Sequence, residues 1–374
     1  MHTLTPYAFD RLASAVDGRL MVCGGAEGPE AVLFAASTDD VATTIDFARR
    51  NGLRVLARRA GQIDGDLRGT VVIRTSLLRD IHLDSAGRVV RVGAGATWGA
   101  VGSTLEPFGM LALGSSGPDC GLVGPVLRGG FGWLGRRHGM SGSTLVAAEL
   151  VTGDGRVRRI DEDTDPELFW ALRGGVDAVG VVTALEYEAR RHEPVHAGEL
   201  SFPLDRAPEV LRAWLEWTDG LDDGTTSRLS LGAAVRIELS AEDRAVVTAL
   251  RALGPVIDTV APSLVSPWPV KTRDRGATMM LDAVDVDTVL QARVPLELQH
   301  LGGALGRPDP RLSLQRLPGR FRLRTRGRAD RDGEVRTLVD ALASLERPIV
   351  RDADTLARLD RVRSAADPAR VMVP

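Results

Sequence analysis

The segment Gly121-Leu-Val-Gly-Pro-Val-Leu-Arg-Gly-Gly-Phe-Gly132 decides how this 374-residue chain is interpreted. Two further glycine-bearing segments, Ala60-Gly61-Gln62 and Leu172-Arg-Gly-Gly-Val-Asp-Ala-Val-Gly180, have the same character. Glycine clusters at the end of a strand let the backbone approach a large planar or phosphorylated ligand, because no Cβ intervenes. Bulky or charged residues stand inside all three clusters. The glycine clusters therefore indicate a dinucleotide-binding protein. The residues that would contact the dinucleotide, however, differ from those such a site usually has.

Composition predicts a soluble protein with two packed domains. Apolar residues make up 44% of the chain and charged residues 26%, and the net charge of -3 gives no reason to expect nucleic acid or a membrane as a partner. No apolar run approaches the roughly 20 residues of a membrane span, and the N-terminus lacks a signal-peptide pattern. Cys23 and Cys120 are expected to be reduced thiols of a cytoplasmic protein. The histidines and cysteines show no metal-ligand spacing, so no metal site is expected.

The N-terminal half alternates strands and helices. A β-α-β unit is predicted from a strand at 31–36, a helix at 41–50 and a strand at 53–57. Turn residues predict hairpins across 81–92 and 145–160. Further elements are expected at 71–74 (strand), 98–107 (helix), 167–173 (helix) and 181–188 (strand).

The pattern changes near Arg190–Pro194, where we place a domain boundary. Beyond it the sequence predicts helices at 207–217, 242–253, 285–292 and 332–345, and alternating strands at 228–239, 296–300 and 321–325. Strands and helices without regular alternation are typical of an α+β domain with an antiparallel sheet.

Five strings together resemble a known family: VGAGATWGAV (92–101), GLVGPVLRGGFGWLGRRHGM (121–140), ELVTGDGRV (149–157), DPELFWALRGG (165–175) and GVVTALEY (180–187). They are similar to the vanillyl-alcohol oxidase superfamily, specifically its berberine-bridge-enzyme-like oxidases. The resemblance runs from about residue 28 to 192 and continues weakly through 295–308. It implies an α+β chain with a two-subdomain PCMH-type FAD-binding domain at 1–192. An α+β substrate domain with an antiparallel sheet would follow at 193–355, and a tail at 356–374 would return to the first domain.

The resemblance also implies FAD as the cofactor. The positions that match the family's flavin contacts are Ala60, Gly61, Gln62, Gly114, Ser115, Gly121, Gly124, Gly129, Gly130, Phe131, Gly132, Gly180 and Val181. Gln62 stands where relatives often carry the histidine that links to the flavin, and an amide has no comparable nucleophilic nitrogen. Gly117 stands where some relatives use a cysteine. Any FAD is therefore expected to be non-covalent.

Several residues inside the glycine clusters differ from the usual family pattern. Loss of FAD binding is therefore an alternative interpretation. Arg128 stands where a glycine is usual, and its side chain either points into solvent or enters the cofactor space. In that space the guanidinium would pair with a phosphate or exclude the cofactor. Pro125 removes a backbone donor, Val176 is β-branched, and Asp177 adds negative charge near the expected pyrophosphate.

Candidate catalytic residues lie on the predicted strand 296–300. Glu297 and Gln299 share one face of that strand and are our acid/base and hydrogen-bonding candidates, with Arg128 as a third residue; an exposed polar face is an equal alternative. Arg320, Arg322, Arg324 and Arg326 alternate along a strand. That pattern is typical of a solvated face, although it also suits recognition of a carboxylate or another anion.

Three functions remain open from the sequence. The leading hypothesis is an FAD-linked tailoring oxidoreductase that oxidises or oxidatively cyclises a small, largely apolar natural product. A flavin-free homologue would instead catalyse a cyclisation, cycloaddition or dehydration in the vacated cleft. The third is a non-catalytic protein that binds a small molecule. The alternating strand faces of the second domain leave a homodimer open.

Overall fold

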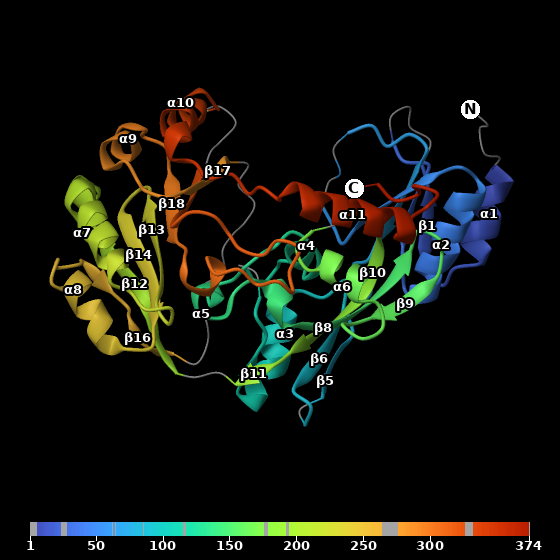
Figure 1. Cartoon of the computed structure of the whole chain (residues 1–374), viewed down its shortest axis with the longest axis horizontal. Coiled ribbons are helices and arrows are strands. Elements are labelled where there is room, and N and C mark those ends of the chain that lie inside the picture. Colours follow the sequence, from blue (N-terminus) through green and yellow to red (C-terminus); the bar gives the residue numbers. More distant parts are fainter. Residues whose placement is uncertain are drawn as a thin grey trace.

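Three main β-sheets and their helices form the computed structural model, shown in Figure 1. It describes residues 6–23, 28–61, 63, 65–84, 86–114, 117–175, 179–191, 194–263, 276–325 and 332–373. The boundary predicted after residue 192 lies outside these residues. Within the described ranges, no helix combines the length and the apolar character needed to cross a bilayer. The sheets confirm the predicted α+β fold class with an antiparallel sheet in the C-terminal half.

The first sheet has four strands in the order β1-β2-β4-β3. Its elements are α1 (Pro6–Ser14), β1 (Arg19–Val22), β2 (Ala31–Phe34), α2 (Thr38–Arg50), β3 (Arg54–Arg58) and β4 (Thr70–Arg74). Strands β2 and β3 both pair in parallel with β4, which confirms the predicted β-α-β unit. Helix α2 begins with a capping box, in which the Ser37 hydroxyl accepts from the Asp40 N–H. The buried Asp40 carboxylate also accepts from the N–H groups of Asp17, Gly18 and Ala36, so the helix start holds the neighbouring loops.

The second sheet is antiparallel, with strand order β5-β6-β10-β8-β9. Its strands are β5 (Ile81–Asp84), β6 (Val89–Gly93), β8 (Leu145–Thr152), β9 (Val157–Ile160) and β10 (Gly180–Glu188). Helices α3 (Trp98–Leu105), α4 (Val123–Leu127), α5 (Gly135–His138) and α6 (Pro166–Leu172) accompany it, and β7 (Met110–Leu111) pairs with β11 (Arg190–Arg191). Both predicted hairpins are confirmed by the β5–β6 and β8–β9 pairings. Its core contains Trp98, Tyr187, Phe169 and Trp170.

The third sheet has eight strands, and helices cover one of its faces (Figure 1). The strands are β12 (Val195–Phe202), β13 (Thr226–Leu231), β14 (Val235–Ala241), β15 (Ile257–Asp258), β16 (Ala261–Ser263), β17 (Thr278–Leu281), β18 (Leu296–His300) and β19 (Phe321–Thr325). The helices are α7 (Ala207–Asp219), α8 (Thr248–Arg251), α9 (Val286–Gln291) and α10 (Asp332–Leu342). Trp214 of α7 lies at the centre of the core between helices and sheet.

Two predictions in this half are wrong. Residues 228–239 are not one strand, because the chain turns at 232–234 and β13 pairs antiparallel with β14. The predicted helix at 242–253 is a 3-10 turn followed by the short α8. Alternation continued across the turn, since Ser230 and Arg236 face each other in register and preserve the period.

The C-terminal helix α11 (Ala353–Ala366) crosses back to the second sheet and packs on α6 (Figure 1). Arg358 pairs with both carboxylate oxygens of Glu167 and lies 3.8 Å from the centre of the Trp170 ring. After the helix, the Asp367 carboxylate accepts from the N–H groups of Val371 and Met372. Met372 then bridges to Val55 in β3, so the tail ties the first two sheets together.

Arg136 of α5 joins the third sheet to the rest of the chain. The side chain is 4% exposed and donates to the carbonyl oxygens of Thr225, Leu301 and Asp222. The Arg136 Nη1 also lies 3.1 Å from the His300 Nε2. Gly303, with φ 55°, permits this approach, because a Cβ there would lie 2.4 Å from the Arg136 carbonyl oxygen.

Replacing this arginine is expected to destabilise the whole chain. Arg136→Met keeps the side-chain volume but leaves buried carbonyl oxygens without donors, so the free energy of unfolding should fall by about 3 kcal/mol. Urea denaturation measures it. Arg137→Gln is the matched control: its ion pair with Glu242 is partly exposed, and the loss should be below about 1 kcal/mol. Equal losses in the two variants would contradict the role given to Arg136.

Candidate functional site

Two rows of polar side chains cross the face of the third sheet that the helices leave uncovered. In the first row Glu238, Arg228, Gln299 and Arg322 are aligned in register across β14, β13, β18 and β19. The second row contains Arg236, Ser230, Glu297 and Arg324 on the same four strands. Side chains alternate between the faces of a strand, and the intervening Ile237, Leu229, Leu298 and Leu323 form the core on the other face.

The loop after the second glycine cluster docks on the first row through two aromatic side chains. The Phe131 ring lies 4.6 Å from the Arg322 guanidinium carbon, and the Trp133 ring lies 5.4 Å from that of Arg228. Such contacts favour a cation against the face of an aromatic ring. The structure thus places the predicted cofactor residue Phe131 beside the same arginine that donates to the predicted catalytic residue Gln299.

Charge is unevenly distributed along these rows. Arg228 pairs with two carboxylates, Glu238 and Glu297, the second at 3.4 Å. Glu297 is 1% exposed, so its carboxylate is held by this arginine away from water. Burial raises the pKa of Glu238, against the opposing effect of Arg228. This surface therefore offers a buried carboxylate suited to proton transfer beside a neutral amide.

The first glycine cluster follows the carboxyl end of β3, where three arginines gather. Arg58 and Arg74 are cross-strand neighbours at the ends of parallel strands. The Arg74 Nη1 is buried and has no hydrogen-bond partner, and burial followed by repulsion from Arg58 lowers the pKa of Arg74. Gly61 has φ 93°, and a Cβ built there would meet nothing within 4 Å. Ligands of parallel sheets bind at carboxyl ends, so this open, cationic loop fits the phosphates of a dinucleotide.

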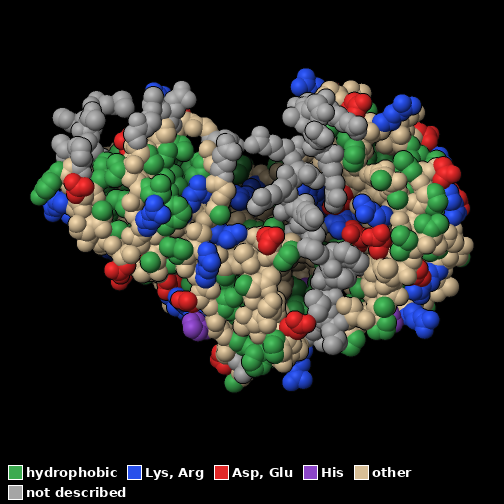
Figure 2. Space-filling view, turned by 180° about the vertical axis from the view of Figure 1, so that it is seen from behind, with side chains coloured by type: hydrophobic (Ala, Val, Ile, Leu, Met, Phe, Trp, Pro, Cys, Tyr) green, Lys and Arg blue, Asp and Glu red, His purple; other side chains and the backbone are tan. Residues whose placement is uncertain are grey.

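Arg59 connects this loop to the second glycine cluster. Its side chain donates to the Asp119 carbonyl and crosses Gly121, where a Cβ would lie 2.7 Å from the Arg59 Cδ. Seen from behind, the molecule has a hollow between its two lobes, and several basic side chains lie along the edges of that hollow (Figure 2). The predicted cofactor residues Ala60, Gly61 and Gly121 thus meet at one place.

The second and third glycine clusters close on the chain's own segment 312–317. A Cβ at Gly129 would lie 2.4 Å from the Leu314 Cδ2, and one at Gly175 would lie 2.3 Å from the Ser313 Oγ. Both the N–H and the hydroxyl of Ser313 donate to the Arg173 carbonyl. These glycines permit close approach between protein segments. This packing segment was missed in the sequence because it has no regular secondary structure.

Other predicted cofactor positions also contact protein. A Cβ at Gly132 would overlap the Gly114 carbonyl oxygen at 1.8 Å, and one at Gly130 would contact Pro125 at 2.7 Å. Gly180 and Val181 begin β10, and the Val181 side chain lies in the core of the first sheet. Gln62, Ser115, Val176 and Asp177 lie outside the described residues.

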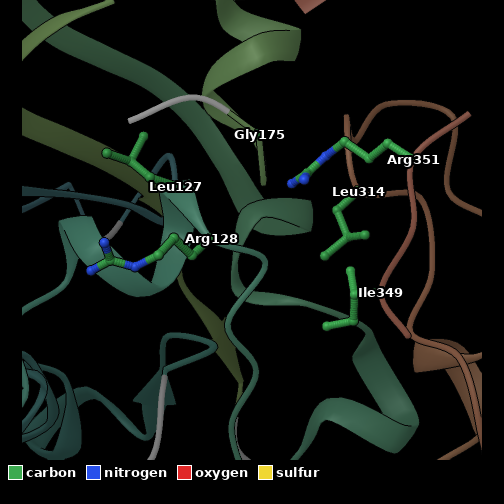
Figure 3. Close-up of a pocket in the computed structure, with 6 residues that line it drawn as sticks. All are labelled: Leu127, Arg128, Gly175, Leu314, Ile349 and Arg351. Carbon is green, nitrogen blue, oxygen red and sulfur yellow. The ribbon is translucent and has the colours of Figure 1, made fainter. Parts of the chain in front are cut away.

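Arg128 does not enter the space between the glycine clusters. Its side chain is exposed and bends back over Gly124, whose built Cβ would lie 2.8 Å from the Arg128 Nη2. Figure 3 shows it directed away from Leu314, Ile349 and Arg351, with which it lines a pocket of about 250 Å³. Arg351 donates to the Gly174 carbonyl at the other side of that pocket. The described residues contain no group of His, Cys, Asp and Glu side chains arranged for a metal ion.

Comparisons with known proteins agree with this arrangement. Residues 29–161 match the family model described as FAD binding domain. (R)-6-hydroxynicotine oxidase of Paenarthrobacter nicotinovorans is 33% identical over 183 residues, which cover 48% of this chain and 39% of that protein. Residues 29–161 of the chain thus match an FAD binding domain, and the chain resembles FAD-linked oxidases in this part. The FAD-linked oxidoreductase easE of Arthroderma benhamiae is 32% identical over 240 residues, 59% of this chain and 46% of that protein. The aligned regions thus span less than half the length of these two relatives.

Two solved structures share the fold over nearly the whole chain. The crystal structure of 6-hydroxy-D-nicotine oxidase from Arthrobacter nicotinovorans has a TM-score of 0.81 at 20% identity, covering 95% of this chain and 96% of that one. Berberine bridge enzyme from Eschscholzia californica has a TM-score of 0.80 at 15% identity, covering 98% of each chain.

Arginines that sequence reasoning did not assign make up much of this site. Arg228 lay inside the predicted strand at 228–239, and Arg136 lay in the basic run Arg136-Arg137-His138, to which no role was assigned. The alternating arginines of β19 were noticed, but a solvated face is wrong for Arg322, whose Nε is fully buried. The alternation of side chains along a strand predicts which residues share a face. It does not predict which distant segment packs on that face.

The buried His300 beside Arg136 should make stability depend on pH. Burial, followed by the charge of Arg136, lowers the pKa of His300 from 6.5 to about 3. The unfolded chain therefore binds more protons between these pH values, and stability is lost as pH falls. The free energy of unfolding should drop by about 1–2 kcal/mol more between pH 7 and pH 5 in the wild type than in His300→Gln, which keeps an acceptor for Arg136. Identical pH profiles in denaturant titrations would refute this assignment.

Proposed function

We propose that this chain is an FAD-linked oxidoreductase that holds FAD non-covalently and oxidises or oxidatively cyclises a small, largely apolar natural product. The observation that supports it most is the open Gly61 loop at the end of β3, together with Arg74 at the end of the neighbouring strand, whose Nη1 has no hydrogen-bond partner. That loop lies inside the segment that matches the FAD binding domain. Arg58, Arg59 and Arg74 would hold the phosphates, because guanidinium groups pair well with phosphate oxygens.

Each part of the polar sheet face has a separate task in this proposal. When bound, FAD accepts the electrons that leave the substrate. Glu297 takes up the proton released from the substrate, because its carboxylate is buried and is held in place by Arg228. Gln299 orients a polar group of the substrate by hydrogen bonding. Phe131 and Trp133 cover the two arginines of the first row and exclude water from it.

A flavin-free homologue is the second candidate, and one observation favours it. Leu314 lies against Gly129, which the resemblance assigns to FAD, and against Gly174 of the third glycine cluster. In such a protein Glu297 and Gln299 would promote a cyclisation, cycloaddition or dehydration by positioning and proton transfer. A non-catalytic binding protein would use the same surface without proton transfer.

Purified protein distinguishes these proposals by its colour. An FAD-linked oxidoreductase should absorb near about 450 nm, and acid precipitation should release the flavin into the supernatant, because Gln62 forms no histidyl link. Flavin that stays with the precipitate would contradict non-covalent binding. A colourless protein whose melting temperature does not rise with added FAD would exclude the leading proposal and favour the flavin-free candidate.

The affinity for FAD should depend on Arg74. Arg74→Gln removes the half-buried cation at the end of β4, and the dissociation constant for FAD should rise about tenfold, the loss of one charge-assisted hydrogen bond. Quenching of flavin fluorescence on titration of the apoprotein measures it. Arg54→Gln is the control, because Arg54 lies at the opposite end of the neighbouring strand and donates to the Arg68 carbonyl. A normal affinity in Arg74→Gln would remove Arg74 from the phosphate site.

A further inference from the structure

Arg322 is the arginine of the polar rows whose bonding is least complete. Its Nη2 donates to the Gln299 Oε1 at 2.5 Å, and Phe131 covers one face of the guanidinium. The Nε is buried and has no hydrogen-bond partner. Since a guanidinium carries five donors, most of the bonding capacity of this group is unused among the described residues.

The charges around Arg322 are not balanced by an ion pair. Arg228, in the same row, pairs with two carboxylates, whereas the side chain between the two arginines is the neutral amide of Gln299. Among the described residues, no carboxylate forms an ion pair with Arg322. Burial, with opposition from Glu297, lowers the pKa of Arg322 to about 10, so the group stays cationic near neutral pH. A half-buried guanidinium that has no ion-pair partner among the described residues would be stabilised by a bound anion.

The surroundings of Arg322 are apolar on the side away from Arg228. Met280 is its cross-strand neighbour on β17. Met280 and Phe131 belong to a buried cluster with Met140, Leu301, Leu305, Leu312, Leu314 and Leu317. At this end of the row the Arg322 guanidinium lies beside apolar side chains. This combination suits a ligand with an apolar body and one acidic group.

We propose that Arg322 and Gln299 bind the carboxylate of the substrate, which makes the substrate class a small apolar carboxylic acid. The guanidinium offers paired N–H donors along its edge, and the Gln299 amide adds a neutral donor. The apolar body would lie against the hydrophobic cluster, beside Met280 and Phe131. The identity of this ligand as a substrate rests on the proposed function, whereas the binding site itself does not.

Calorimetric titration of the purified full chain tests the site directly. The probes are 3-phenylpropanoate and 4-phenylbutanoate, each compared with its neutral amide of the same shape. Wild type should bind the better acid at least about tenfold more tightly than its amide, the value of one hydrogen bond to a charged group. The preference should disappear in Arg322→Gln. It should also disappear in Gln299→Glu, because a carboxylate at 299 would occupy the fork while the arginine remains.

Arg320→Gln is the matched control, since Arg320 lies just before the same strand and pairs with the exposed Asp219. It should keep the wild-type preference. If Arg322→Gln does not fold, Gln299→Glu decides alone. Wild type that binds neither acid, or binds acid and amide equally, would overturn the proposal, as would an acid preference that survives in Gln299→Glu. Flavin absorbance of the same samples distinguishes this proposal from the proposed function. Bound FAD without a preference for the acid would contradict only the carboxylate site. A preference for the acid without bound FAD would contradict only the oxidoreductase.

Discussion

The insertion of Arg136 into the third sheet is the interaction on which the rest of the site depends. Its guanidinium donates to carbonyl oxygens at the turn before β13 and just after β18. Because Phe131 and Trp133 precede Arg136 by only a few residues, the same anchor sets how this loop meets the polar rows. A small shift of α5 would separate both aromatic rings from their arginines.

The three glycine clusters have different physical roles. Around Gly61 the chain leaves space and positive charge, which suits a phosphorylated ligand. Around Gly129 and Gly175 the missing Cβ atoms admit Leu314 and Ser313. The polar rows extend this contrast, because a fully paired Arg228 stands beside an incompletely bonded Arg322. Binding capacity is therefore concentrated at two places, the end of β3 and the end of the first row.

Sequence reasoning reached the fold because its signals are local. The capping residues of α2, the hairpin turns and the strings shared with the family all act over short distances, and the structure confirms those elements. Glu297 and Gln299 were correctly assigned to one strand face. The partners of that face were not predicted, since Phe131 and Trp133 reach it from a distant segment. Arg128 shows the same limit: its identity suggested an altered cofactor surface, but its backbone position directs the side chain over Gly124.

A crystal structure grown in the presence of FAD is the most direct test of the central claim, that an altered but functional dinucleotide site persists beside the polar sheet face. We expect density for phosphates at Gly61 and Arg74, and for the flavin ring between the glycine clusters and the row that contains Gln299. Leu314 would then keep its contacts with Gly129 and Gly174. A structure without cofactor density, in which segment 312–317 fills the space that the ring requires, would contradict it.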